Sequence, residues 1–393
     1  MQPHPHLRKA VIFFCVTFFI ASWSSFLHQN LPSRHHGEDT KNASLTNSIY
    51  NTTLGYQAVY ALVLPDRLDR AQSLLDAANA TNINVTILDA VRDRQIPKDA
   101  WPKHWGEQRD PKEGELGCLV SHVRTWKKIV AEKVTSALIM ESDADWDMRI
   151  KDIMGPMGEG IKALVDWPFN RTLEQTGGIP DGTLSPYGDN WDIIWMGHCG
   201  SYNYGDGRIW RFNDTAVPPE EHEYRFGGVP EDDQHVPGTR MVYSLRGGVC
   251  STAYAISYQG AVKLVKYFED AGDNIDLALG WYCDHMVDMA CVGVWPQVIT
   301  AAATRSNILH PEGEVAPGQD IDEEIHPGPS LQYSARVNAQ KAMQGLGQEH
   351  WQPEWNSTWV MKNDEWKLVT FDEYKVIKEV EAMEKMNSTV TKG

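Results

Sequence analysis

The stretch from Ala137 to Asp145, ALIMESDAD, decides the fold and the place of the expected site. Its apolar first half predicts a buried strand, and its second half carries the carboxylates of Glu141, Asp143 and Asp145. Ligands of an open α/β sheet bind outside the carboxyl ends of its strands, where these acids would lie. Carboxylate oxygens suit Mg²⁺ or Mn²⁺, and such an ion can hold substrate phosphates. The stretch therefore predicts a divalent-cation site, with a solvent-exposed acidic strand end as the alternative.

The segments around this stretch alternate between strand and helix patterns. The predicted strands are Gln57 to Leu64, Asn84 to Ala90, Asp192 to Met196, Thr252 to Ser257 and Val292 to Ile299. The predicted helices are Asp66 to Ala78, Glu115 to Glu132, Gly260 to Phe268, Asp276 to Ala290 and Phe371 to Met386. This order predicts an α/β fold with a central, mostly parallel sheet. Between them, the segment from Ser201 to Gly238 is rich in glycine, proline and charge and is predicted to be a long loop.

The composition limits the class of protein. The chain has 393 residues, which favours a single large catalytic domain with appendages. Its hydrophobic content of 42% is sufficient for a full core. The formal net charge of −17 argues against nucleic acid as a partner, because a polyanion would be repelled.

The N-terminal region carries an uncharged apolar run, Ala10 to Leu27, which is long enough to cross a bilayer. Arg8 and Lys9 precede it, so the positive-inside rule predicts a cytoplasmic N-terminus and a lumenal body. We therefore expect a single-pass type II protein of the Golgi or another secretory-pathway membrane. A cleaved signal peptide that ends in the small residues Ala21 to Ser25 is the alternative.

These observations give a domain plan with five parts. Residues 1–9 form a cytoplasmic tail, 10–27 a transmembrane helix and 28–55 a polar lumenal stem. The expected α/β domain spans residues 56–310, and residues 311–393 form a C-terminal extension.

N-glycosylation sequons are frequent after the apolar run, which agrees with a lumenal body. Exposure to the secretory pathway is the setting in which such asparagines are modified. The predicted sites are Asn42, Asn51, Asn79, Asn84, Asn170, Asn213, Asn356 and Asn387.

The cysteines of the body would meet an oxidising lumen. Their number is odd, so at least one is expected to be free. Cys199 and Cys250 can pair if the strands beside them are neighbours. Cys283 and Cys291 are too far apart on one unbroken helix, so their pairing requires the helix to end between them.

Several motifs, in this order along the chain, resemble those of glycosyltransferase family 25. Tyr60 to Arg70, YALVLPDRLDR, is similar to the family's opening strand and its Asp/Arg turn. The most specific match is Gly114 to Trp126, GELGCLVSHVRTW, which is similar to the family's Gly-x-x-Gly-Cys-x-x-Ser-His helix. Trp191 to Cys199, WDIIWMGHC, is similar to another strand of the family. ALIMESDAD resembles the strand that ends in Glu-Asp-Asp, although Ser142 replaces the middle acid.

The resemblance implies a GT-A-like nucleotide-sugar-binding fold and an inverting, metal-assisted transfer of a sugar. The expected donor is a UDP-sugar, the expected sugar is galactose, and the acceptor is a hydroxyl of a glycan or glycoprotein. Mn²⁺ or Mg²⁺ is the expected cofactor, with Glu141, Asp143 and Asp145 as candidate ligands. Ser142 leaves open whether Glu141-x-Asp143 or the DxD motif Asp143-Ala144-Asp145 is the ligand pair.

Other residues in these motifs are candidates for binding and catalysis. The donor-binding candidates are Asp66, Arg67, Arg70, Ser121, His122 and His198. Each has a structural alternative, namely a surface ion pair for the first three and a buried hydrogen-bond network for the others. The candidates for the base that deprotonates the acceptor hydroxyl are Asp276 and Asp284.

Two other functions are compatible with these patterns. A catalytically inactive glycan-binding protein would keep the fold and lose the chemistry, and Ser142 is consistent with such a loss. A glycoside hydrolase would use two carboxylates without a metal ion. The acceptor and the oligomeric state are not given by the sequence.

Overall fold

The computed structural model describes residues 48–107, 109–166, 185–203, 208–218, 236–268, 272–302, 331–353, 357–362 and 365–370. The chain divides into two units, Met1–Ser44 and Leu45–Gly393, and every described residue lies in the second. The predicted anchor, Ala10 to Leu27, and the predicted helix Phe371 to Met386 lie outside the described residues. Among the residues described, no helix is both long and apolar enough to span a membrane.

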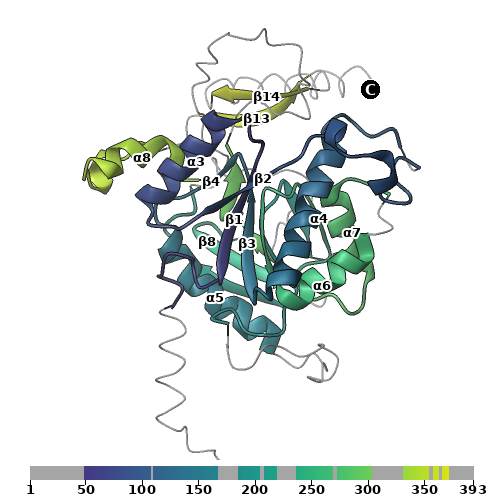
Figure 1. Ribbon diagram of the computed structural model, residues 1–393. Coiled ribbons are helices and arrows are strands. Elements are labelled where there is room, and N and C mark those ends of the chain that lie inside the picture. Colours follow the sequence, from purple (N-terminus) through teal and green to yellow (C-terminus); the bar gives the residue numbers. More distant parts are fainter. Residues whose placement is uncertain are drawn as a thin grey trace, which may run out of the picture. The chain divides into compact units, whose positions relative to one another are not determined.

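The centre of the second unit is an eight-stranded sheet with the order β2-β1-β3-β10-β5-β11-β8-β7 (Figure 1). Its strands are β1 Ala58–Val63, β2 Thr86–Asp89, β3 Ser136–Glu141, β5 Ile193–Gly197, β7 Ile209–Asn213, β8 Thr239–Ser244, β10 Ala253–Ser257 and β11 Cys291–Trp295. Six of the eight strands run in one direction, and only β8 and β10 are reversed. The predicted α/β fold with a mostly parallel sheet is therefore confirmed.

Helices cover both faces of this sheet. Successive side chains of β1 point to opposite faces and so enter two separate cores. Val59, Ala61 and Val63 point into the first core, together with side chains of two helices, α3 Leu68–Ala80 and α5 Ile150–Asp166. Tyr60 and Leu62 point into the second core, which includes three helices, α4 Glu115–Glu132, α6 Tyr258–Tyr267 and α7 Ile275–His285. Figure 1 shows α4, α6 and α7 grouped together, away from α3.

Smaller elements complete the unit. Three two-stranded sheets pair β4 Ala144–Trp146 with β12 Ile299–Ala301, β6 Gly200–Tyr202 with β9 Gly247–Val249, and β13 Ser357–Lys362 with β14 Glu365–Thr370. Among the described residues, the remaining helix is α8 Ala335–Met343, and the 3₁₀ turns are η1 Asp93–Gln95, η2 Lys98–Ala100 and η7 Gln348–His350.

Three sequence predictions need correction. The segment from Ser201 to Gly238 is not wholly loop, because β7 lies within it and pairs with β8 at the edge of the sheet. Helix α7 ends at His285 rather than Ala290. Helix α8 follows the predicted domain end at residue 310 but packs against α3, so residues 331–353 contribute to the α/β unit.

Both predicted disulfides are confirmed. Strands β5 and β10 are neighbours, and Cys199, which follows β5, is bonded to Cys250, which precedes β10. Because α7 ends at His285, the chain turns back and brings Cys291 to Cys283. Cys118 is the one free cysteine among the described residues.

Four of the predicted glycosylation sites lie in the described part of the chain: Asn51, Asn79, Asn84 and Asn213. All four asparagines are exposed. The sequon of Asn79 differs from the others, because its threonine, Thr81, is buried and accepts a hydrogen bond from Trp146 Nε1. The other four predicted sites, Asn42, Asn170, Asn356 and Asn387, lie outside the described residues.

Candidate active site

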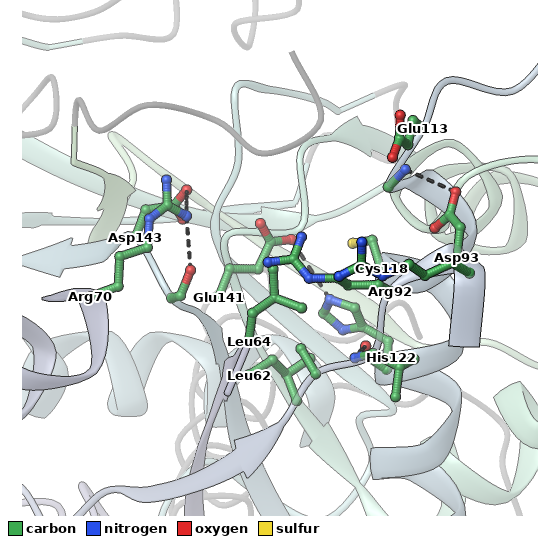
Figure 2. A pocket seen from close by; sticks show the side chains of 16 residues that line it. Leu62, Leu64, Arg70, Arg92, Asp93, Glu113, Cys118, His122, Glu141 and Asp143 are labelled. Atoms are coloured by element: carbon green, nitrogen blue, oxygen red, sulfur yellow. Dashed lines mark hydrogen bonds and ion pairs between the residues drawn. The ribbon is translucent and has the colours of Figure 1, made fainter. Parts of the chain in front are cut away.

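A pocket lies where three parallel strands end, at the carboxyl ends of β1, β2 and β3. Its volume of about 160 Å³ is far larger than the space of a single water molecule, so it can receive part of a ligand. Its lining comprises Leu62, Leu64, Arg70, Ala90, Val91, Arg92, Asp93, Arg94, Glu113, Gly114, Cys118, Ser121, His122, Glu141, Ser142 and Asp143 (Figure 2). This is the place in an open α/β sheet where ligands are expected.

The first turns of α4 are fastened to the loop after β2. Asp93 accepts hydrogen bonds from Gly114 N at 2.9 Å and from Gly117 N at 2.6 Å. Ser121 Oγ accepts a bond from Val91 N at 2.9 Å. The two bonds to Asp93 satisfy donors at the start of the helix, and all three hold its N-terminal end at the pocket, where the helix dipole favours negative charge.

Gly117 is required at this junction. A Cβ there would press into the carbonyl oxygen of Val91 and lie 2.9 Å from Asp93 Oδ1. We therefore expect Gly117→Ala to lower the free energy of unfolding by about 1–3 kcal/mol, because backbone must move to admit the methyl group. Thermal unfolding followed by circular dichroism measures this effect. Arg124→Ala, at an exposed position of the same helix, is the control, and equal stability of the two variants would contradict the account.

Glu141 and Asp143 both line the pocket, but their environments differ. Burial opposes the ionisation of Glu141, yet the neighbouring His122, Ser251 and Arg70 outweigh it and lower the pKa of this carboxyl. Burial and the charge of Glu141 raise the pKa of Asp143, against the opposing effect of Arg70. Asp143 Oδ1 is buried without a hydrogen-bond partner. One more positive charge between the two carboxylates would relieve their repulsion and satisfy this oxygen.

Asp145 is placed away from the pocket, contrary to its prediction as a metal ligand. It is fully buried, and its Oδ2 accepts a bond from Ser334 Oγ at 2.5 Å. Its Oδ1 accepts bonds from the backbone amides of Trp146 and Arg336 at 2.9 and 3.2 Å. Strand β4 turns this side chain toward α8, so the geometry favours Glu141 and Asp143 over the DxD pair as cation ligands.

His122 is buried on α4 and lies beside Glu141. Its Nδ1 is 2.8 Å from Tyr254 Oη, which also accepts a bond from Trp126 Nε1. Its Nε2 has no hydrogen-bond partner and is 3.7 Å from Glu141 Oε1. One turn before it on α4, Cys118 also lines the pocket, and burial together with nearby carboxylates raises the pKa of its thiol well above the usual value.

The three residues predicted to bind the donor after the first strand have different positions. Arg70 lines the pocket, and its Nη1 donates to Ser142 Oγ at 2.9 Å and lies 3.5 Å from Asp143 Oδ2. Asp66 is exposed and pairs with Arg92, which itself lines the pocket. Arg67 lies outside the lining and pairs with Asp69. Only Arg70 of the three thus faces the pocket.

Of the other three donor-binding candidates, Ser121 and His122 line the pocket, whereas His198 does not. His198 is buried, with Nε2 2.8 Å from the carbonyl oxygen of Val294, and burial lowers its pKa to about 4. This histidine directly follows β5 and is buried against the backbone of β11, outside the pocket lining.

The two base candidates lie on α7 in different settings. Asp276, in its first turn, accepts hydrogen bonds from Cys250 N and Leu277 N. Burial and, to a lesser extent, the charge of Glu141 raise the pKa of Asp276, which is not in the pocket lining. Asp284 is exposed and lies beside His285.

Several pocket residues were missed by sequence reasoning. Arg92, Arg94 and Asp93 come from the loop after β2, and no apolar period or short motif marks them. Cys118 was recognised only as part of the family motif, although its spacing of four residues from His122 puts both on one helix face. The four-residue spacing was therefore a sequence signal that the two side chains lie close together.

An α/β sheet with carboxylates, arginines and a helix N-terminus at its strand ends is typical of proteins that bind phosphorylated ligands. Comparison with known proteins finds a family model that matches part of the chain. Residues 57–166 match the model of glycosyltransferase family 25, described as a lipopolysaccharide biosynthesis protein family. This region of the chain is similar to that family, in agreement with the resemblance of its motifs.

Relatives with assigned names align with parts of the chain. Procollagen galactosyltransferase 2 of Mus musculus is 28% identical over 130 residues, which cover 30% of this chain and 21% of that protein. Procollagen galactosyltransferase 1 of Danio rerio is 25% identical over 164 residues, or 36% and 26% of the two chains. Inactive glycosyltransferase 25 family member 3 of Mus musculus is 25% identical over 155 residues, or 37% and 22%. The matched region thus spans about a fifth to a quarter of each relative.

Proposed function

We propose that this protein is a glycosyltransferase that transfers a sugar, with galactose the expected one, from a UDP-sugar to a hydroxyl of a glycan or glycoprotein. The observation that carries the proposal is the pocket of Arg70, Glu141 and Asp143 at the carboxyl ends of β1 and β3, within the family match. The names of the galactosyltransferase relatives support the choice of sugar. The proposal includes a GT-A-type donor site, inversion at the anomeric carbon, and a body that faces the lumen of the secretory pathway.

The positive groups of the pocket suit a pyrophosphate. Arg70 from α3 and Arg92 from the loop after β2 both line it, as does Gly114 at the N-terminal end of α4. Guanidinium groups donate charge-assisted hydrogen bonds to phosphate oxygens in a fixed geometry. These residues would bind the diphosphate and orient the sugar toward the acceptor.

The residues present also fit a divalent cation such as Mn²⁺ or Mg²⁺. Glu141 and Asp143 would hold it, because both face the pocket and Asp143 Oδ1 lacks a partner. When bound, the ion would act as a Lewis acid that neutralises charge on the departing diphosphate. Arg70 would hold Asp143 in place from the other side.

Asp276 is the better candidate for the base. Its raised pKa makes it a stronger proton acceptor than an ordinary aspartate, and its two backbone hydrogen bonds fix its orientation. In this role it would accept the proton of the acceptor hydroxyl as that oxygen attacks the anomeric carbon.

The test is a screen for nucleotide release from UDP-sugars by the full chain in detergent. We expect UDP to be released from UDP-galactose in Mn²⁺, to stop in EDTA and to return when Mn²⁺ is added back. Release of sugar from glycosides without effect of EDTA would instead support a glycoside hydrolase.

A catalytically inactive glycan-binding protein is the second candidate. It is favoured by Ser142 in place of an acid and by the relatives that are named inactive. Saturable binding of UDP-galactose or of a glycan without any UDP release would establish this alternative.

A further inference from the structure

Three side chains of the pocket lining form a mixed group of possible metal ligands, which includes a thiol and an imidazole as well as a carboxylate. The Cys118 sulfur, a ring nitrogen of His122 and a carboxylate oxygen of Glu141 all lie within 4.8 Å of one another. Figure 2 shows the three converging from α4 and from the end of β3. A thiol and an imidazole prefer transition metals to Mg²⁺ or Ca²⁺.

Unsatisfied atoms support a ligand at this place. His122 is 1% exposed, yet its Nε2 has no hydrogen-bond partner and is 3.7 Å from Glu141 Oε1. Two atoms bound to the same metal at about 2.0–2.2 Å are separated by a gap of this size, wider than a hydrogen bond. Nothing else among the described residues satisfies this nitrogen.

The surroundings would orient His122 for binding through Nε2. With the proton on Nδ1, the ring donates to Tyr254 Oη, which is itself fixed by Trp126 Nε1. Ser251 Oγ donates to Glu141 Oε1 at 2.6 Å, so the carboxylate is held as well. Metal-binding histidines and carboxylates are commonly oriented by such outer hydrogen bonds.

We propose that Cys118, His122 and Glu141 form a zinc-type site in this pocket, with sulfur, nitrogen and oxygen as its three protein ligands. Three such ligands leave one tetrahedral position open to water or to a substrate oxygen. Glu141 is shared with the Mn²⁺ or Mg²⁺ site proposed above, so the two ions compete for it. The inference does not depend on transferase activity, because it rests on these donor atoms alone.

The experiment titrates the metal-free full chain in detergent with Co²⁺, a spectroscopic substitute for Zn²⁺, under conditions that keep the disulfides intact. All samples carry Cys15→Ser, which leaves Cys118 as the one cysteine outside the two disulfides. We expect an intense thiolate-to-cobalt absorption band that Zn²⁺ displaces. Cys118→Ser should abolish this band, whereas Asp143→Asn, which alters only the neighbouring oxygen ligand, should retain it.

A second readout needs no variant of the site. Zn²⁺ should slow alkylation of Cys118 by N-ethylmaleimide at least about tenfold, because a metal-bound thiolate is shielded. The proposal would be overturned if the band were absent, if it persisted in a folded Cys118→Ser chain, or if it were lost in Asp143→Asn. It would also be overturned if Zn²⁺ left the rate of Cys118 alkylation unchanged. A chain that shows the band but releases no UDP would support the zinc-type site and contradict the proposed transferase. A chain that releases UDP but shows no band would support the transferase and contradict the zinc-type site.

Discussion

Replacing Asp143 by asparagine is expected to reduce sugar transfer by at least about 100-fold, because a cation ligand would be lost at the departing diphosphate. Asparagine keeps the size and shape of the side chain, so the space it fills in the pocket is unchanged. Because the amide is neutral, its contact with Arg70 is weaker than that of the carboxylate. The measurement is transfer from UDP-galactose at saturating Mn²⁺, with circular dichroism to verify folding.

Asp89→Asn is the matched control for this variant. Asp89 is an exposed aspartate at the end of the neighbouring strand β2, and it is not in the pocket lining. We expect the control to retain activity within about threefold, since exposed substitutions away from a site have small effects. A folded Asp143→Asn enzyme with metal-dependent turnover near that of the control would remove Asp143 from the site.

Replacing Asp145 by alanine is expected to lower the free energy of unfolding by about 3–5 kcal/mol, because a buried positive charge would lose the nearby carboxylate that offsets it. That charge belongs to Arg336, whose Nε and Nη2 donate to the carbonyl oxygens of Ala144 and Ser142 at 2.8 and 2.7 Å. The loss would also leave Ser334 Oγ without its acceptor. Chemical denaturation of the full chain measures the change.

Asp99→Ala serves as the control for stability, because Asp99 is exposed on the short turn η2. It should change the free energy of unfolding by no more than about 0.5 kcal/mol. An Asp145→Ala chain that is as stable as this control but unable to transfer sugar would show that Asp145 is a metal ligand after all.

The local elements of the fold were predictable where the apolar pattern was strong. Strands β1, β3 and β5 and helix α4 follow directly from uninterrupted apolar runs or a clear helical period. Helix α5 was missed, although Ile150, Ile153, Met154, Met157 and Ile161 line one face, because Pro156 and three glycines obscure that period. Strand β7 was missed because it is an edge strand with a half-exposed pattern inside a polar segment.

The candidate site was predictable only in part, for a physical reason. Glu141 and Arg70 belong to recognisable motifs, and the end of a buried strand places the acids at one edge of the sheet. The direction of Asp145 depends on Ser334 and Arg336, nearly two hundred residues later in the chain. Alternation along a strand cannot show such a long-range partner, so the sequence left the choice between the two ligand pairs open.

The most direct test of the central claim, that this pocket binds the nucleotide-sugar, is a calorimetric titration of UDP-galactose in Mn²⁺. Arg70→Gln, inside the pocket, is compared with Arg67→Gln, which lies outside the lining three residues earlier. The account predicts that Arg70→Gln weakens binding about 10- to 100-fold, the effect of one charge-assisted hydrogen bond, while Arg67→Gln changes it less than about threefold. Equal affinities of the two folded variants, or stronger weakening by Arg67→Gln, would contradict it.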